Sequence, residues 1–263
     1  MVVSTPTVIY EKKDQVAHIT LNRPDALNAL NREIRVGINE AITDFRDDPE
    51  MLVAIMTGAG GRAFSAGMDL KERARLDSEG DFREPPPVAG GGSFIDLGVF
   101  KPIIAAIDGF CVAGGLELSL QCDIRIATEK SEFGLPEPRW NITAGYGLHN
   151  LSRMVPLGEA LHMQLTGSRI SSERAYQIGL IQEVVADRDE LFVAANRMAE
   201  EVKLCGPLAI KAIKQIVYQG RNLPVEYSQK LAQPLVAVVG ASEDAIEGPR
   251  AFSEKRRPVW KLR

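Results

Sequence analysis

The chain has 263 residues, of which 45% are hydrophobic and 25% charged, and this balance is typical of a globular protein with one large domain or two small ones. Its net charge of −4 argues against a protein that coats nucleic acid or binds membranes through a basic surface. No apolar run in the sequence approaches the ~18–20 residues that a membrane-spanning helix requires. Because the first residues also lack the basic start and apolar core of a signal peptide, we expect a cytoplasmic protein.

Neither the three cysteines nor the three histidines have the spacing of metal ligands. The cysteines, at positions 111, 122 and 205, are odd in number and fit neither a disulfide framework nor a zinc site. Cys111 and Cys122 lie in apolar sequence, where small buried thiols are expected. We therefore expect no metal and no redox cofactor.

Strand and helix patterns alternate in the first half of the chain. Residues 8–10 and 16–21 are expected to be strands joined by a charged turn, and residues 31–46 show the apolar spacing of a helix. Three nearly unbroken apolar runs, at 51–57, 103–107 and 124–127, are typical of strands buried on both faces. Because helical patterns separate these runs, the sequence predicts an α/β fold with a mostly parallel sheet.

The character of the chain changes twice after this. Residues 76–100 contain a run of three prolines and, separately, a run of three glycines, and they show no apolar periodicity. We therefore expect a long loop that acts as a lid or is disordered. After residue 171 the chain becomes mainly helical. One helix is expected to begin within 171–175, and further helices are expected over residues 191–204, 207–218 and 241–252.

Two glycine-rich turns follow buried strands. Residues 58–63 match the pattern G-x-G-x-x-A, but the turn-prone residues 64–67 follow where a dinucleotide-binding helix should begin. If residues 66–70 instead open a short helix, the Met68 amide has no partner within that helix and can face an anion. Gly114 and Gly115 precede a second helix, so the two turns together could supply the paired backbone donors of an oxyanion hole. The alternative is that Gly67 only permits a tight turn.

Two glutamates stand out by their neighbours. Glu117 lies among leucines in the first turn of the expected second helix, where it either complements the helix dipole or is a buried catalytic carboxylate. Glu137 lies between two prolines, in a surface turn or in a rigid loop that faces Glu117 across a pocket. Paired carboxylates can hold a water molecule and move protons on and off it.

In order and spacing, these stretches resemble the enoyl-CoA hydratase/isomerase (crotonase) superfamily, and its enoyl-CoA hydratases most closely. The segments that carry the resemblance are 22–30, 64–70, 108–123, 133–137 and 252–256, so it spans almost the whole chain. The resemblance implies a spiral of ββα units over residues 1–200. It also implies a C-terminal helical region over residues 201–263 that packs trimers, often paired into hexamers.

The resemblance also implies an activity and a set of residues. The activity is the addition of water across the 2,3-double bond of a 2-enoyl-CoA thioester, with coenzyme A as part of the substrate. The Met68 and Gly114 amides match the oxyanion hole, and Glu117 and Glu137 match the two catalytic glutamates. The implied CoA-binding residues are Arg23, Ala26, Leu27, Ala66, Lys71 and, from a neighbouring subunit, Lys255.

Two departures from the family pattern affect these expectations. Ala113 replaces the first glycine of a triple-glycine turn, which is tolerable because the donor is the Gly114 amide. Trp140 and Tyr146 occupy a stretch that is glycine-rich in many short-chain hydratases, so we expect an unusual acyl group or a reaction run as dehydration. Isomerisation on the same scaffold remains an alternative, as does a non-catalytic binding relative, although the presence of both glutamates favours hydration.

Overall fold

The structure, a computed structural model, describes residues 6–80 and 93–262. Its main sheet has the strand order β1-β2-β3-β5-β7-β10. These strands are Val8–Lys13, Val16–Leu21, Val53–Gly58, Ile103–Ile107, Ile124–Thr128 and Glu183–Val185. β1 and β2 are antiparallel, and every other neighbouring pair is parallel. β3 and β5 are buried along their whole length, as their unbroken apolar sequences predict.

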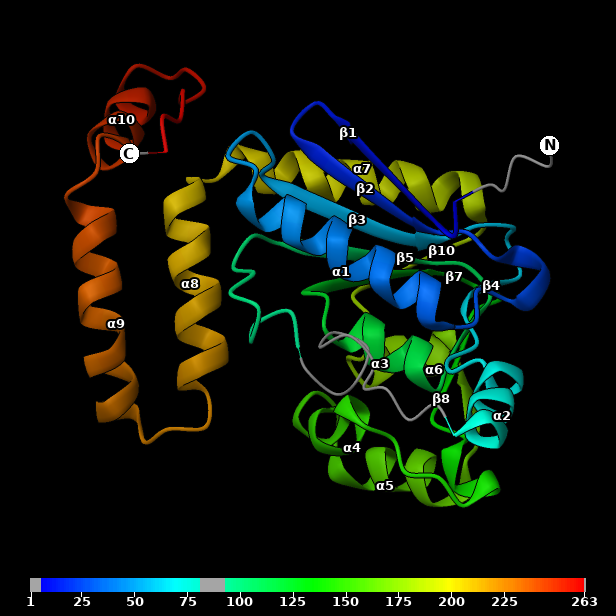
Figure 1. Ribbon diagram of the computed structural model, residues 1–263. Coiled ribbons are helices and arrows are strands. Elements are labelled where there is room, and N and C mark those ends of the chain that lie inside the picture. The colour runs from blue at the N-terminus through cyan, green and yellow to red at the C-terminus, as the bar shows by residue number, and fades with distance from the viewer. Residues whose placement is uncertain (1–5, 81–92, 263) are drawn as a thin grey trace.

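Helices cover both faces of this sheet (Figure 1). On one face α7 (Arg188–Leu204) packs its small apolar side chains against β3, β5 and β7. On the other face α1 (Arg32–Asp47) buries Ile34, Ile38, Ile42 and Phe45 in the larger apolar cluster of the molecule. The Asn31 side chain caps α1 by accepting a hydrogen bond from the Ile34 amide at 3.0 Å, so the helix begins where its apolar spacing predicts.

A second sheet has the order β4-β6-β8-β9, with strands Ala63–Ser65, Phe110–Val112, Glu132–Gly134 and Arg169–Ser171. β4, β6 and β8 are parallel, whereas β9 is antiparallel to β8. Each of the three parallel strands follows a strand of the main sheet by a few residues and is itself followed by a helix. The α/β spiral of ββα units is therefore confirmed.

The helical segments that follow these strands are short. They are α2 (Leu70–Glu79), α3 (Gly114–Leu120), η3 (Glu137–Trp140), α4 (Tyr146–Asn150), η4 (Leu151–Arg153), α5 (Leu157–Thr166) and α6 (Ser172–Gln177), with η1 (Pro24–Ala26) before α1. The loop expected from residue 76 begins later than predicted. Residues 76–79 belong to α2, which ends at Gly80 because that residue adopts a left-handed conformation. Residues 81–92 of the expected lid lie outside the described residues. Its last part, 93–100, packs into the core through the fully buried Phe94 and Val99, so this part is not a lid.

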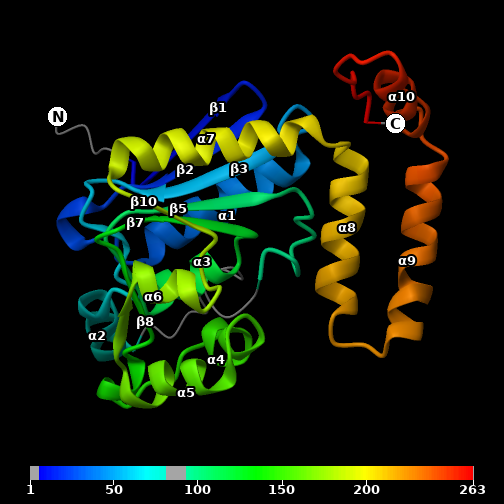
Figure 2. The ribbon, with the colours of Figure 1, turned by 180° about the vertical axis from the view of Figure 1, so that it is seen from behind.

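The last three helices stand beside the core as an arm (Figures 1 and 2). α8 (Pro207–Gly220) and α9 (Val225–Gly240) form a hairpin that leads to α10 (Asp244–Ser253). α7 packs on the sheet through Val202, and the arm begins after it, at Gly206 and α8. The division of the chain at 200/201 stays a prediction. None of the helices within residues 6–80 and 93–262 combines the length and apolarity needed to cross a bilayer.

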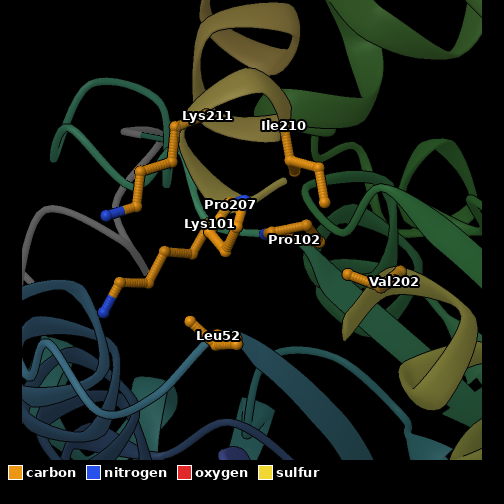
Figure 3. Close-up of a pocket in the computed structure, with 7 residues that line it drawn as sticks. All are labelled: Leu52, Lys101, Pro102, Val202, Pro207, Ile210 and Lys211. Carbon is orange, nitrogen blue, oxygen red and sulfur yellow. The ribbon is translucent and has the colours of Figure 1, made fainter. Parts of the chain in front are cut away.

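A small pocket lies where the arm joins the core (Figure 3). It is lined by Leu52, Lys101, Pro102, Val202, Pro207, Ile210 and Lys211. The Lys101 ammonium donates to the Phe45 carbonyl at 2.8 Å and so caps the C-terminal end of α1. None of the site residues expected from the sequence lines this pocket, so we assign it to the joint between core and arm.

Candidate active site

The two glycine turns lie against each other because they continue the neighbouring parallel strands β4 and β6. Gly67 has φ +84°, and a Cβ atom built on it falls 2.5 Å from the Ala113 Cβ and 2.7 Å from the Gly114 nitrogen. A Cβ atom built on Gly114 falls 3.6 Å from the Met68 nitrogen. Only glycine at position 67 permits this close approach, which brings the Met68 and Gly114 amides together.

Both amides are available to a ligand. Gly114 is the first residue of α3, so its N–H has no acceptor within the helix. Met68 forms a bridge with Leu30, in which the Leu30 amide donates to the Gly67 carbonyl at 2.7 Å. Neither the Met68 nor the Gly114 amide donates to an acceptor in the described part of the chain. Two neighbouring free donors are the arrangement that an oxyanion hole requires.

Glu117 is the catalytic candidate on α3. The Gly147 amide, at the start of α4, donates to Glu117 Oε1 at 2.8 Å. Gly145 also lies against this carboxylate, since a Cβ atom built there falls 3.5 Å from Glu117 Oε1. Burial raises the pKa of Glu117, while the amides of Gly147 and Gly145 and the charge of Arg35 oppose that rise. Glu117 is therefore half-buried, and its carboxylate accepts a hydrogen bond from a backbone amide in a fixed position.

Glu137 begins η3, directly after β8. Its Oε2 atom is buried and has no hydrogen-bond partner among the residues that the structure describes. Burial raises the pKa of Glu137 to about 7; the charge of Glu117 adds to the rise, and the residue's own amide opposes it. The structure thus places the two glutamates near enough for the charge of Glu117 to act on Glu137, and neighbouring carboxyl groups are the arrangement expected of an acid–base pair.

The candidates for CoA binding near the N-terminus lie close to the oxyanion turn. The Ala66 amide donates to the Leu27 carbonyl at 3.0 Å, which joins the turn after β4 to η1. Arg23 donates to the Ala29 carbonyl at 2.6 Å and to Asp69 Oδ2 at 3.0 Å. The Arg23 side chain therefore holds the segments around Ala29 and Asp69 together. Lys71 lies in the first turn of α2, close to the same segment.

The other predicted residues are more scattered. Lys255 follows α10, which lies at the end of the arm, on the side of the molecule away from α2 in both ribbon views (Figures 1 and 2). Its expected contact with CoA across a subunit boundary stays a prediction. Trp140 is 68% exposed, whereas Tyr146 is half-buried and packs against the main apolar cluster. Of the two bulky residues, Tyr146 is the one that lies beside Glu117, through its neighbour Gly147.

Sequence reasoning assigned no role to three residues that shape this site. Asn28 is fully buried, and its amide nitrogen donates to the carbonyls of Ala59 and Ala63 at 3.0 and 2.8 Å. These hydrogen bonds join the segment after η1 to the loop before β4 and to the first residue of β4. Gly145 and Gly147 form the cradle of Glu117, and the glycine-rich sequence at 145–147 was the available signal.

Comparisons with known proteins agree with this architecture. The sequence pattern of the family described as "Enoyl-CoA hydratase/isomerase" matches residues 11–263. The chain is 36% identical to the (E)-benzylidenesuccinyl-CoA hydratase of Thauera aromatica, over 97% of this chain and 98% of the relative. It is 40% identical to the carnitinyl-CoA dehydratase of Salmonella typhi, over 94% of this chain and 95% of the relative.

Solved structures show the same fold. The crystal structure of an enoyl-CoA hydratase from Mycobacterium tuberculosis H37Rv superposes with a TM-score of 0.89 at 37% identity, over 98% of this chain and 99% of the other. A probable enoyl-CoA hydratase/isomerase from Mycobacterium abscessus gives 0.89 at 36% identity, over 99% and 100% of the two chains. The chain belongs to the enoyl-CoA hydratase/isomerase family, the crotonase superfamily.

Proposed function

We propose that the protein is a hydro-lyase that adds water across the 2,3-double bond of a 2-enoyl-CoA and gives a 3-hydroxyacyl-CoA. The observation that carries this proposal is the pair Glu117 and Glu137, two half-buried carboxyl groups close enough for the charge of Glu117 to raise the pKa of Glu137. The neighbouring free amides of Met68 and Gly114 add the oxyanion hole that the same reaction needs.

The oxyanion hole acts on the thioester carbonyl. Addition of water at Cβ moves negative charge onto the thioester oxygen, because the double bond is conjugated to that carbonyl. The Met68 and Gly114 amides donate to this oxygen and stabilise the enolate. Loss of one such donor typically lowers kcat by about 10²–10³.

Each glutamate carries out one of the two proton transfers. The Glu117 carboxylate accepts a proton from water as the water oxygen bonds to Cβ, and the protonated Glu137 gives its proton to Cα. The product then carries one hydroxyl and one new C–H bond, and the two glutamates exchange a proton through solvent to return to the starting state. Arg23, Ala26, Leu27, Ala66 and Lys71 are proposed to contact the CoA portion, with Lys255 reaching it from a neighbouring subunit of a trimer or hexamer.

The names of the relatives bear on the acyl group and on the direction. One relative is a hydratase of a CoA thioester with an aromatic and branched acyl part, and another is a dehydratase. The same site runs in either direction, since each glutamate simply reverses its role. We propose an acyl group other than a short straight chain, because the bulky Tyr146 precedes Gly147, whose amide binds Glu117, and so changes the shape of the region beside that carboxylate.

The test is the loss of enoyl-thioester absorbance with a panel of 2-enoyl-CoAs of graded length that includes benzylidenesuccinyl-CoA, and with carnitinyl-CoA in the dehydration direction. We expect rapid turnover of at least one member. Glu117→Gln and Glu137→Gln should each lose several powers of ten in turnover and keep their affinity for CoA ligands. Near-normal hydration by both variants contradicts the mechanism.

A 3-enoyl-CoA belongs in the same panel. Conversion of that compound alone, without hydration of any 2-enoyl-CoA, makes the protein an isomerase in which one glutamate carries the proton. CoA binding with no turnover of any member makes it a non-catalytic relative.

A further inference from the structure

The peptide between Gly67 and Met68 carries one of the two proposed oxyanion donors, and a hydrogen bond to its carbonyl fixes its orientation. The Gly67 carbonyl accepts this bond from the Leu30 amide at 2.7 Å. In a planar trans peptide the carbonyl and the following N–H point in opposite directions. The bond from Leu30 therefore sets the direction in which the free Met68 N–H points.

An ion pair spans this hydrogen bond. The Nη1 atom of Arg23 donates to the carbonyl of Ala29, the residue before Leu30, at 2.6 Å. Its Nη2 atom donates to Oδ2 of Asp69, the residue after Met68, at 3.0 Å. The two side chains of the pair are only 22% and 14% exposed, so solvent screens their attraction less than that of a surface pair. One guanidinium thus joins the two segments that the hydrogen bond connects.

The Asp69 carboxylate has a second task on its other oxygen. Its Oδ1 atom accepts the amides of Lys71 and Glu72 at 3.2 Å each, and so caps the N-terminal end of α2. Glu72 adds another link between the two segments, because its Oε2 atom accepts the Arg32 amide at 2.8 Å. The residue that follows Met68 is therefore held both by its own helix and by Arg23.

We propose that Arg23 and Asp69 are positioning residues that hold the Gly67–Met68 peptide in the plane that the oxyanion hole requires. A backbone donor stabilises developing charge well only when it already points at that charge before the reaction. The ion pair acts on both neighbours of the peptide and so opposes its rotation. Both terminal nitrogens of Arg23 are used within the chain, which leaves its backbone and aliphatic stem for the proposed contact with CoA.

The inference rests on the proposed function for its catalytic consequence, although the clamp itself needs no substrate. Asp69→Asn is the first variant, because asparagine can still cap α2 but brings no negative charge to Arg23. Arg23→Gln removes the other half of the pair. Asp77→Asn is the matched control, since the same substitution in the same helix breaks the exposed ion pair with Arg73.

The first measurement separates kcat from binding. With the 2-enoyl-CoA that the parent hydrates fastest, we expect kcat to fall about tenfold in each variant, which is less than the loss of a whole oxyanion donor. The Kd for CoA should stay at the parent value. The double variant should lose no more than either single variant, because both substitutions remove the same pair. Asp77→Asn should match the parent in kcat and in Kd.

The second measurement needs no turnover. Hydrogen exchange of the Leu30 amide, followed by mass spectrometry of peptides that cover this residue, reports how often its bond to the Gly67 carbonyl opens. We expect exchange about tenfold faster in Asp69→Asn and Arg23→Gln and unchanged exchange in Asp77→Asn.

Three results would each overturn the proposal. These are unchanged Leu30 exchange in whichever variant folds, a loss that lies in the Kd for CoA while kcat is unchanged, and losses that multiply in the double variant. If the parent hydrates no 2-enoyl-CoA while the two variants still exchange faster at Leu30, the proposed hydration fails and the clamp stands. The two failures are therefore distinguishable.

Discussion

The carboxyl groups of Glu117 and Glu137 lie near enough for the charge of one to act on the other, but the protein gives them different hydrogen bonds. Glu117 Oε1 accepts a hydrogen bond from the Gly147 amide at 2.8 Å, whereas Glu137 Oε2 is buried with no partner among the described residues. The fixed amide stabilises a carboxylate at position 117, and desolvation favours a neutral acid at position 137. Glu117 is therefore suited to accept a proton from a water molecule, and Glu137 is suited to donate a proton to the substrate Cα.

This difference predicts the pH dependence of the reaction. Hydration needs a protonated Glu137, whose pKa is raised to about 7, so kcat/KM for hydration should fall as the pH rises through about 7. It should also fall at low pH, where Glu117 gains a proton. Dehydration of a 3-hydroxyacyl-CoA needs the form with Glu117 protonated and Glu137 ionised, which holds the same number of protons, so its kcat/KM should follow the same profile. A kcat/KM for hydration that stays constant between about pH 6 and pH 8 would contradict the proton-donor role of Glu137.

Glu137→Gln should make the protein more stable above neutral pH. Burial raises the pKa of Glu137 in the folded state, so folding favours its protonated form, and stability is lost as the pH rises from the unfolded pKa through about 7. An uncharged amide removes this loss, and we expect a gain in unfolding free energy of about 1–2 kcal/mol at pH 8. Urea unfolding at pH 5 and pH 8 measures it. The gain should vanish at pH 5, and an equal effect at both pH values would contradict the explanation.

Much of this architecture could be predicted from local sequence. Unbroken apolar runs predicted β3 and β5, and the spacing of apolar residues together with the Asn31 cap predicted α1. The second sheet could not be predicted in this way, because β4, β6, β8 and β9 have three residues each and are too short to show a period. Helix α9 was missed for a different reason: it contains Pro234, which normally breaks a helix interior.

The candidate site was proposed from the sequence where residue type and turn type indicate the same chemistry. Gly67, Gly114 and the two glutamates carry residue-type signals that point to an oxyanion hole and an acid–base pair. Asn28 carries no such signal, because a single asparagine in a loop is usually exposed. Only the fold shows that Asn28 is fully buried and that its side chain donates to the Ala59 and Ala63 carbonyls.

Gly67→Ala should disrupt the oxyanion hole. The new Cβ atom would lie 2.5 Å from the Ala113 Cβ and 2.7 Å from the Gly114 nitrogen, so the two turns must separate. We expect kcat to fall by about 10²–10³. Gly179→Ala is the matched control, because Gly179 has a similar φ of +78° but no heavy atom within 4 Å of the added Cβ. Both variants bear backbone strain of about 1–3 kcal/mol, so equal activities for the two would refute the role of the turn contact.

Ala113→Gly should stabilise the protein and leave its turnover nearly unchanged. Ala113 has φ 52° and ψ −134°, a conformation that disfavours any residue with a Cβ atom and costs about 1–3 kcal/mol. Glycine relieves that strain, although its greater freedom in the unfolded chain costs about 0.4–1 kcal/mol. We expect a net gain of about 1 kcal/mol in unfolding free energy, measured by urea denaturation. Activity should persist because the proposed donor is the amide of Gly114.

The control for this substitution is Ala41→Gly, at a buried position inside α1 where the backbone is helical. There the same change should destabilise the protein by about 1 kcal/mol, since glycine lowers helix stability by that amount. The opposite signs at positions 113 and 41 isolate the backbone conformation as the cause, because the side-chain change is identical. A loss of stability at both positions would mean that the methyl group of Ala113, packed against Gly67, contributes more than its strained backbone costs.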